Sequence, residues 1–304
     1  MQTEFYTFGE ILWDCLPSGR HAGGAPFNVA AHLTQLGSSA TLISSIGNDP
    51  FGDEILQVAV EKGVNTEFIS RHPNLPTGTV MVKINEKGNA TYDIVEPVAW
   101  DEIEVPPEAV EAIAQARGFV FGSLSCRSEK NIKALDAILD LKGPMKFFDV
   151  NLRPPYADPG CVVHLADRAD VIKLNHEEVG KLAAWIQTGD ANCDEPLDTD
   201  SVARAAAILA EKTNTPVICV TRAENGAALW DRGTMVITPA PHVRVKDTVG
   251  AGDSFMAGLM IGLTNNRDAR EVIGNACRVG AFVASHHGAT PLLPADIRDA
   301  FAYA

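Results

Sequence analysis

Residues 23–47 read GGAPFNVAAHLTQLGSSATLISSIG, and this stretch decides the fold class. The Gly-Gly-Ala-Pro turn opens an apolar segment over 27–36 that is expected to be helical and that ends at Gly37. Residues 41–47 then read as a short buried strand. The alternation extends outward, with a strand expected over 5–12 and a helix over about 50–62. A strand, helix, strand, helix order indicates an α/β fold with a mostly parallel sheet.

This rhythm changes between about residues 77 and 105. Residues 78–85 and 90–95 alternate apolar and polar side chains, and 86–89 reads as a hairpin turn. We expect antiparallel strands added to the parallel core. Such a hairpin is a candidate lid that excludes water from the substrate site, or else an edge hairpin with no moving role.

From residue 118 the alternation resumes. Buried strands are expected at 118–123, 146–150, 171–174 and 217–221, and an exposed polar loop over 188–200 leads into a helix at 201–212.

Polar side chains follow most of these strands. In open α/β sheets ligands gather at the carboxyl ends of strands, so these residues outline one crevice. Each of them alone is also typical of a solvated loop. They are Asp14, Asn151, Arg153, Asn175, Glu177, Glu178 and Thr221.

Near the C-terminal end, residues 247–255 read DTVGAGDSF, a glycine turn at the start of an apolar helix. Amides of Gly250, Ala251 and Gly252 are expected to be free there and to form an anion site with the helix dipole. An ionised Asp253 in the same turn can accept a proton from an attacking hydroxyl. An ordinary helix start has the same Asp-Ser pattern. The turn matches neither a P-loop nor a clear dinucleotide fingerprint.

Composition narrows the classes of partner. Among 304 residues, 39 are acidic and 25 basic, and the formal charge of −14 disfavours nucleic acid or an anionic membrane. A soluble, cytoplasmic protein is expected, because no apolar run approaches the roughly 18 residues of a membrane span and the start lacks a secretory pattern. The cysteines show no C-x-x-C spacing, which argues against zinc and a disulfide framework: Cys15, Cys126, Cys161, Cys193, Cys219 and Cys277.

Taken together, these motifs resemble those of the PfkB/ribokinase family of carbohydrate kinases over nearly the whole chain. The stretch 247–255 resembles the C-terminal family signature and 23–30 the N-terminal one, while Asn175-x-x-Glu178 and a Gly288-Ala289 turn also match. The runs 9–14 and 149–153 look most like the fructokinase branch. The resemblance implies a single ribokinase-like α/β domain over 1–304, a three-layer αβα fold with a mostly parallel central sheet and a small β lid from about 12–20 and 77–100.

The resemblance also implies roles for individual residues. Asp253 matches the base that receives the proton of the sugar hydroxyl, and Gly250, Ala251 and Gly252 match the amides that stabilise the transferring phosphoryl group. The positions that hold sugar hydroxyls are matched by Asp14, Gly24 and Asn28. Arg153 matches a position that contacts the substrate or a phosphate. Asn175 and Glu178 match the pair that organises the magnesium of MgATP, Glu178 through water, and the nucleotide positions are matched by Thr221, Gly226 and Asn275.

Two positions depart from the family pattern. Ala223 stands where the nucleotide loop usually has glycine, which puts its conformation in question. Many members bind a monovalent cation, for which Asp247 and the Val249 carbonyl are the matched ligands, yet Leu292 replaces a hydroxyl there. Potassium activation therefore stays open.

The implied activity is ATP-dependent phosphorylation of a small sugar, with fructose as the first choice. A 2-keto-3-deoxygluconate kinase, whose substrate carboxylate Arg153 would bind, is the alternative, as is another sugar or nucleoside kinase of the family. A non-catalytic sugar-sensing member is the alternative from another class. A homodimer through the lid is expected, because the strand edge at 78–95 tends to be paired or covered.

Overall fold

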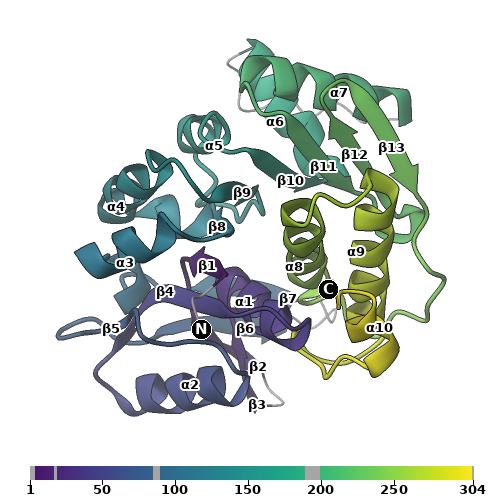
Figure 1. Ribbon diagram of the computed structural model, residues 1–304. Coiled ribbons are helices and arrows are strands. Elements are labelled where there is room, and N and C mark those ends of the chain that lie inside the picture. Colours follow the sequence, from purple (N-terminus) through teal and green to yellow (C-terminus); the bar gives the residue numbers. More distant parts are fainter. Residues whose placement is uncertain (1–3, 17–18, 85–89, 189–198, 303–304) are drawn as a thin grey trace.

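The structure of the protein is a computed structural model, and it describes residues 4–16, 19–84, 90–188 and 199–302 (Figure 1). In this part of the chain the main sheet has nine strands in the order β13-β12-β11-β10-β9-β8-β1-β4-β5. The seven from β11 to β5 are parallel, and β12 and β13 are antiparallel at one edge. In that order the strands are Thr234–Thr238, Ala227–Asp231, Val217–Thr221, Val171–Asn175, Met145–Asp149, Gly118–Gly122, Phe5–Phe8, Ala40–Gly47 and Ile69–His72.

Helices cover both faces of this sheet, so the fold has three layers (Figure 1). Alternate strand residues enter two separate cores, for example Phe147 in one and Phe148 in the other. The first core packs under α1 (Ala25–Gln35), α2 (Pro50–Glu61), α8 (Ala251–Thr264), α9 (Ala269–Ala284) and α10 (Ala295–Asp299). The second packs under α3 (Pro107–Ile113), α4 (Glu129–Leu139), α5 (Pro159–Ala166), α6 (His176–Thr188) and α7 (Thr199–Lys212).

The expected first strand over 5–12 is wrong, because the chain bends after β1. Gly9 has a φ of 141°, and a Cβ there would lie 2.8 Å from Cγ of Pro26. The residues beyond the bend, Leu12–Leu16, form β2 and leave the main sheet for a second one.

That second sheet has the order β3-β2-β6-β7. It combines β2 with β3 (Gly19–Gly23), β6 (Gly78–Ile84) and β7 (Ala90–Ile94). The predicted antiparallel pairing of the hairpin is confirmed, with Val80 opposite Ile94. The predicted turn at 86–89 lies outside the described residues, as does most of the predicted loop at 188–200.

The other predicted elements are confirmed within two residues at either end. Strands β3, β5, β12 and β13 were not predicted. Short 3-10 turns, η1 (Ala99–Asp101), η2 (Leu124–Arg127) and η3 (Ala223–Asn225), lie in the connections. Within the described ranges, the helices are all too short or too polar to cross a bilayer.

Candidate active site

The N-terminus of α8 forms the predicted glycine turn. Gly250 is its N-cap residue, with a φ of 77°, and a Cβ there would lie 2.3 Å from the carbonyl oxygen of Ala289. The amide of Ala251 donates to the carbonyl oxygen of Thr248 at 3.2 Å, so the expectation that all three turn amides are free is wrong. Among the described residues the amides of Gly250 and Gly252 have no acceptor, which leaves them available to an anion.

Asp253 lies in the first turn of α8, half-buried. Its Oδ2 accepts a hydrogen bond of 2.8 Å from Nδ2 of Asn28, a buried residue of α1 that is 225 positions away in the chain. Burial raises the pKa of Asp253 to about 6, with a further rise from the carboxylate of Asp149. The Asn28 hydrogen bond and the charges of Lys173 and Arg153 oppose that rise. A carboxyl group that ionises just below neutral pH is suited to act as a general base.

Asp14 lies on β2, next to the turn that leads into α1. A Cβ on Gly23 would lie 2.5 Å from Oδ2 of Asp14, so the carboxylate lies directly against the backbone of Gly23. Burial raises the pKa of Asp14 to about 6, opposed by the charges of His21 and Arg153. The structure therefore places Asp14 beside the Gly-Gly turn.

Gly24 begins α1 with a φ of 107°, and a Cβ there would lie 2.4 Å from the carbonyl oxygen of Glu10. The side chain of Glu10 stabilises the same turn, because its Oε1 accepts a hydrogen bond of 3.2 Å from the amide of Ala25. Burial raises the pKa of Glu10 to about 7.

A narrow pocket opens between this turn and the ends of β8 and β9. Among its lining residues, Glu10 and Asp149 each present a buried carboxylate oxygen that lacks a partner within the described part of the chain. Asn28 Oδ1 is a third buried acceptor of this kind. Buried acceptors without partners are costly, so these three oxygen atoms are candidates for contact with hydroxyl groups of a ligand.

Arg153 follows β9 and is exposed. Its positive charge opposes the rise in the pKa of Asp14, Glu10 and Asp253 alike. The charge of the guanidinium group therefore favours the ionised form of all three carboxyl groups, which come from three different segments of the chain.

Asn175 and Glu178 lie where β10 passes into α6. Oδ1 of Asn175 accepts from the amides of Glu177 and Glu178, each at 2.9 Å. The carboxylate of Glu178 accepts from the amides of Asn175 at 2.9 Å and Leu152 at 2.8 Å, and burial raises its pKa. Because these oxygens already hold backbone amides, the pair fits contact with magnesium through water better than direct ligation. No cluster of three or more metal-ligating side chains occurs among the residues described.

The residues matched to nucleotide positions in the sequence follow β11 or lie on α9. Thr221 ends β11, and its hydroxyl donates to the carbonyl oxygen of Leu174 at 3.3 Å. Ala223 adopts a φ of 48°, so alanine takes the left-handed conformation that the family glycine would favour. Gly226 has a φ of 82°, and a Cβ there would lie 2.0 Å from a backbone oxygen of β13. Asn275 is half-buried on α9.

Asp247 links the glycine turn to Gly288 by hydrogen bonds. Its Oδ1 accepts from the amide of Val249 at 3.0 Å, and its Oδ2 from the amide of Gly288 at 3.1 Å. Leu292 is 81% exposed, and its hydrocarbon side chain has no atom that could ligate a cation.

The sequence pattern assigned no role to Lys173 or Asp149, which form a buried ion pair of 2.7 Å beneath the site. The available signal was a lysine inside an otherwise apolar strand, a position where a charged side chain is rare unless paired.

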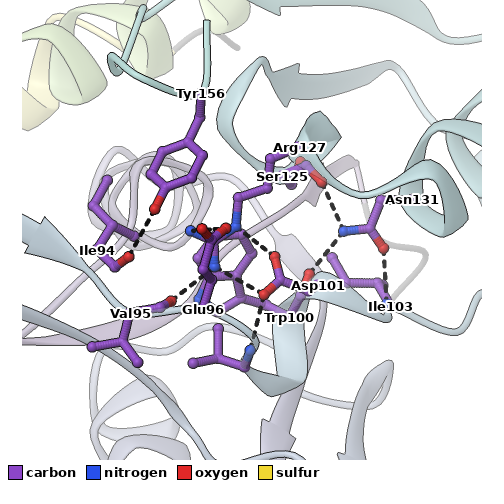
Figure 2. Close-up of polar contacts among 11 residues, drawn as sticks. Ile94, Val95, Glu96, Trp100, Asp101, Ile103, Ser125, Arg127, Asn131 and Tyr156 are labelled. Atoms are coloured by element: carbon purple, nitrogen blue, oxygen red, sulfur yellow. Dashed lines mark hydrogen bonds and ion pairs between the residues drawn. The ribbon is translucent and has the colours of Figure 1, made fainter.

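The end of β7 is anchored to the core by Arg127 and Tyr156 (Figure 2). Nη2 of Arg127 donates to the carbonyl oxygen of Val95 at 2.9 Å and to Asp101 at 2.8 Å, and Tyr156 Oη donates to the carbonyl oxygen of Ile94 at 3.1 Å. The guanidinium carbon lies 4.0 Å from the ring centroid of Trp100 and 4.8 Å from that of Tyr156. Two side chains of the core thus fix the point where the second sheet leaves it.

Comparison with known proteins adds to this geometry. The model of the pfkB family carbohydrate kinases matches residues 10–296. The chain is 27% identical to the fructokinase of Escherichia coli, with 97% of each protein covered. A solved structure of a sugar kinase from Pyrococcus horikoshii superposes with a TM-score of 0.80 at 25% identity, covering 99% of this chain and 100% of that one.

Arabidopsis thaliana ribokinase, solved with ribose and ATP, superposes with a TM-score of 0.81 at 19% identity, over 100% of each chain. This likeness shows that the fold is ribokinase-like. Because the family model matches nearly the whole chain, the protein belongs to the pfkB family and is an ATP-dependent carbohydrate kinase.

Proposed function

We propose that this kinase is a fructokinase, which transfers the γ-phosphoryl group of ATP to a primary hydroxyl of fructose. The contact that supports it best is the 2.8 Å hydrogen bond between Asp253 and Asn28. This bond joins the anion turn to the turn that resembles the family's sugar-binding signature. The relatives named fructokinases, such as that of E. coli, support fructose as the substrate.

In this proposal Asp253 accepts the proton of the attacking hydroxyl. The amides of Gly250 and Gly252 stabilise charge on the transferring group, while Asp14, Gly24 and Asn28 hold other sugar hydroxyls. Thr221, Gly226 and Asn275 border the nucleotide. Asn175 and Glu178 would hold the magnesium of MgATP, Glu178 through water, and the metal would supply positive charge that neutralises the phosphates.

A substrate panel tests the choice of sugar. Fructose, ribose, 2-keto-3-deoxygluconate and adenosine are compared by kcat/KM, and fructose is expected to be highest. The 2-keto-3-deoxygluconate alternative is favoured by the charge of Arg153 at the site. It would be adopted if that sugar acid gave the highest kcat/KM and Arg153→Gln lost activity toward it alone.

Asp253→Asn tests the base. We expect kcat to fall by roughly 10²- to 10⁴-fold, because the amide cannot take the proton. Binding of ATP, measured by calorimetry, should be retained. Asp299→Asn, an exposed position on α10, is the control. Near-normal turnover in folded Asp253→Asn would show that another group is the base.

We also propose potassium binding at Asp247 and the Val249 carbonyl. Asp247 accepts hydrogen bonds from the amides of Val249 and Gly288, so its negative charge lies at the turn that carries the Val249 carbonyl group. Potassium is expected to raise kcat over sodium at equal ionic strength. Identical rates in the two salts would remove this site from the proposal.

A further inference from the structure

Lys173 and Asp149 form a buried ion pair on the two strands that end at the site. They are register partners across β10 and β9, and Nζ of Lys173 donates to Oδ1 of Asp149 at 2.7 Å. The two side chains are only 7% and 5% exposed. A buried pair is often no more stabilising than apolar residues of similar size, so stability alone is a weak reason for its presence.

The ammonium group reaches the glycine turn itself. A Cβ on Gly252 would lie 3.6 Å from Nζ of Lys173, so the ammonium group lies close to the backbone that presents Asp253. Burial works against the charge of Lys173, but Asp149, Glu178 and Asp253 together hold its pKa above the ordinary value. Lys173 is therefore a cation shared by three carboxylates.

We propose that Lys173 is a positioning residue for phosphoryl transfer, a buried, permanently charged group that keeps Asp253 anionic and ready to accept the proton of the sugar hydroxyl. Asp149 holds the ammonium group in place, and its own negative charge works against the ionisation of Asp253. The inference rests on the proposed function, because it takes Asp253 as the base.

Charged groups face Asp253 from several elements. Asp149 on β9 and Glu10 after β1 are acidic, whereas Lys173 on β10 and Arg153 after β9 are basic. Lys173 is the buried cation of the set, and Arg153 is exposed, where water and salt screen its charge. Removal of Lys173 should therefore shift the ionisation of Asp253 more than removal of Arg153.

The test compares Lys173→Gln with Lys146→Gln, the same change near the start of β9, away from the site. The kcat/KM for the sugar that the wild type phosphorylates is measured from about pH 5 to about pH 9. In Lys173→Gln the acidic limb of the kcat/KM profile should move up by about one pH unit. Loss of a nearby cation raises the pKa of the Asp253 carboxyl group, and such a cation lowers a carboxyl pKa by at least that much. Because the pKa of Asp253 in the wild type is about 6, activity should thus fall roughly fivefold near pH 6 and largely recover at alkaline pH. Lys146→Gln should leave the limb in place.

Variants of the pair separate charge from structure. Lys173→Arg keeps the charge and should keep the limb near its wild-type position. Lys173→Gln/Asp149→Asn removes both charges, so it should fold even if a single variant does not, and its limb should lie below that of Lys173→Gln. Binding of ATP, measured by calorimetry, confirms that each variant is folded.

The outcomes separate the two hypotheses. If the wild type phosphorylates none of the sugars in the panel, the proposed function fails. If the wild type is active and the Lys173→Gln profile falls equally at all pH values, Lys173 is a structural residue and this inference alone fails. It also fails if the acidic limb of the double variant coincides with that of Lys173→Gln.

Discussion

At Gly250 both the backbone and its surroundings exclude a side chain. Its φ of 77° strains any other residue, and a Cβ would meet the Ala289 carbonyl oxygen. We expect Gly250→Ala to lower the free energy of unfolding by more than the roughly 1 kcal/mol typical of φ strain alone. It should also remove most kinase activity. Gly233→Ala is the matched control, since Gly233 has a φ of 95° with no atom within 4 Å of an added Cβ. Urea unfolding and steady-state rates measure both, and equal losses in the two variants would contradict the crowding argument.

Glu10 makes the free energy of unfolding depend on pH. Burial raises its pKa from 4.5 to about 7, so between these values the folded protein keeps a proton that the unfolded chain has released. The free energy of unfolding should therefore fall as pH rises through this window, by up to about 3 kcal/mol from this group. Urea unfolding at several pH values should show a smaller fall in Glu10→Gln than in the wild type. An unchanged slope would mean that Glu10 is ionised in the folded protein throughout.

At the scale of elements, the root of β7 links the second sheet to the core. Tyr156→Phe removes the hydrogen bond to the Ile94 carbonyl oxygen and keeps the ring beside Arg127. We expect a loss of about 1 kcal/mol in stability and a severalfold rise in the KM for sugar, with little change in kcat. Ser70→Ala, which removes a hydrogen bond to the Ser44 carbonyl oxygen in the main sheet, is the control. A KM that rises equally in both variants would argue against a role of this anchor in sugar binding.

At the scale of the whole molecule, we propose a homodimer through the second sheet. This sheet exposes Leu16 and Met81, which are 37% and 43% accessible, beside strand edges suited to pairing. Light scattering of the purified protein should give twice the 32.5 kDa chain mass. Met81→Glu should shift it to monomer, whereas Leu292→Glu, at an exposed apolar residue elsewhere, should not. A wild-type monomer at micromolar concentration would contradict the dimer.

The local pattern predicts the elements well where one signal dominates. Apolar runs between glycine and proline stops placed α1, β4, α2 and the strands from β8 to β11 close to their bounds. It failed at 5–12, because Gly9 bends the chain where the pattern is continuous, and at β12 and β13, whose place depends on pairing with β11. The glycine turn and Asp253 were recognisable because their residue types and spacing are local.

Sequence alone determined the fold class, the family resemblance and the residues of the two signature turns, since these are carried by contiguous stretches. Tertiary structure decided which of them meet. Asn28 reaches Asp253 across 225 residues only because α1 packs against α8, and Lys173 meets Asp149 only through the register of β10 on β9. It also showed that the Ala251 amide is already bonded. Burial, which exists only in the folded chain, then raises the pKa of Asp253, Asp14 and Glu10 toward neutrality.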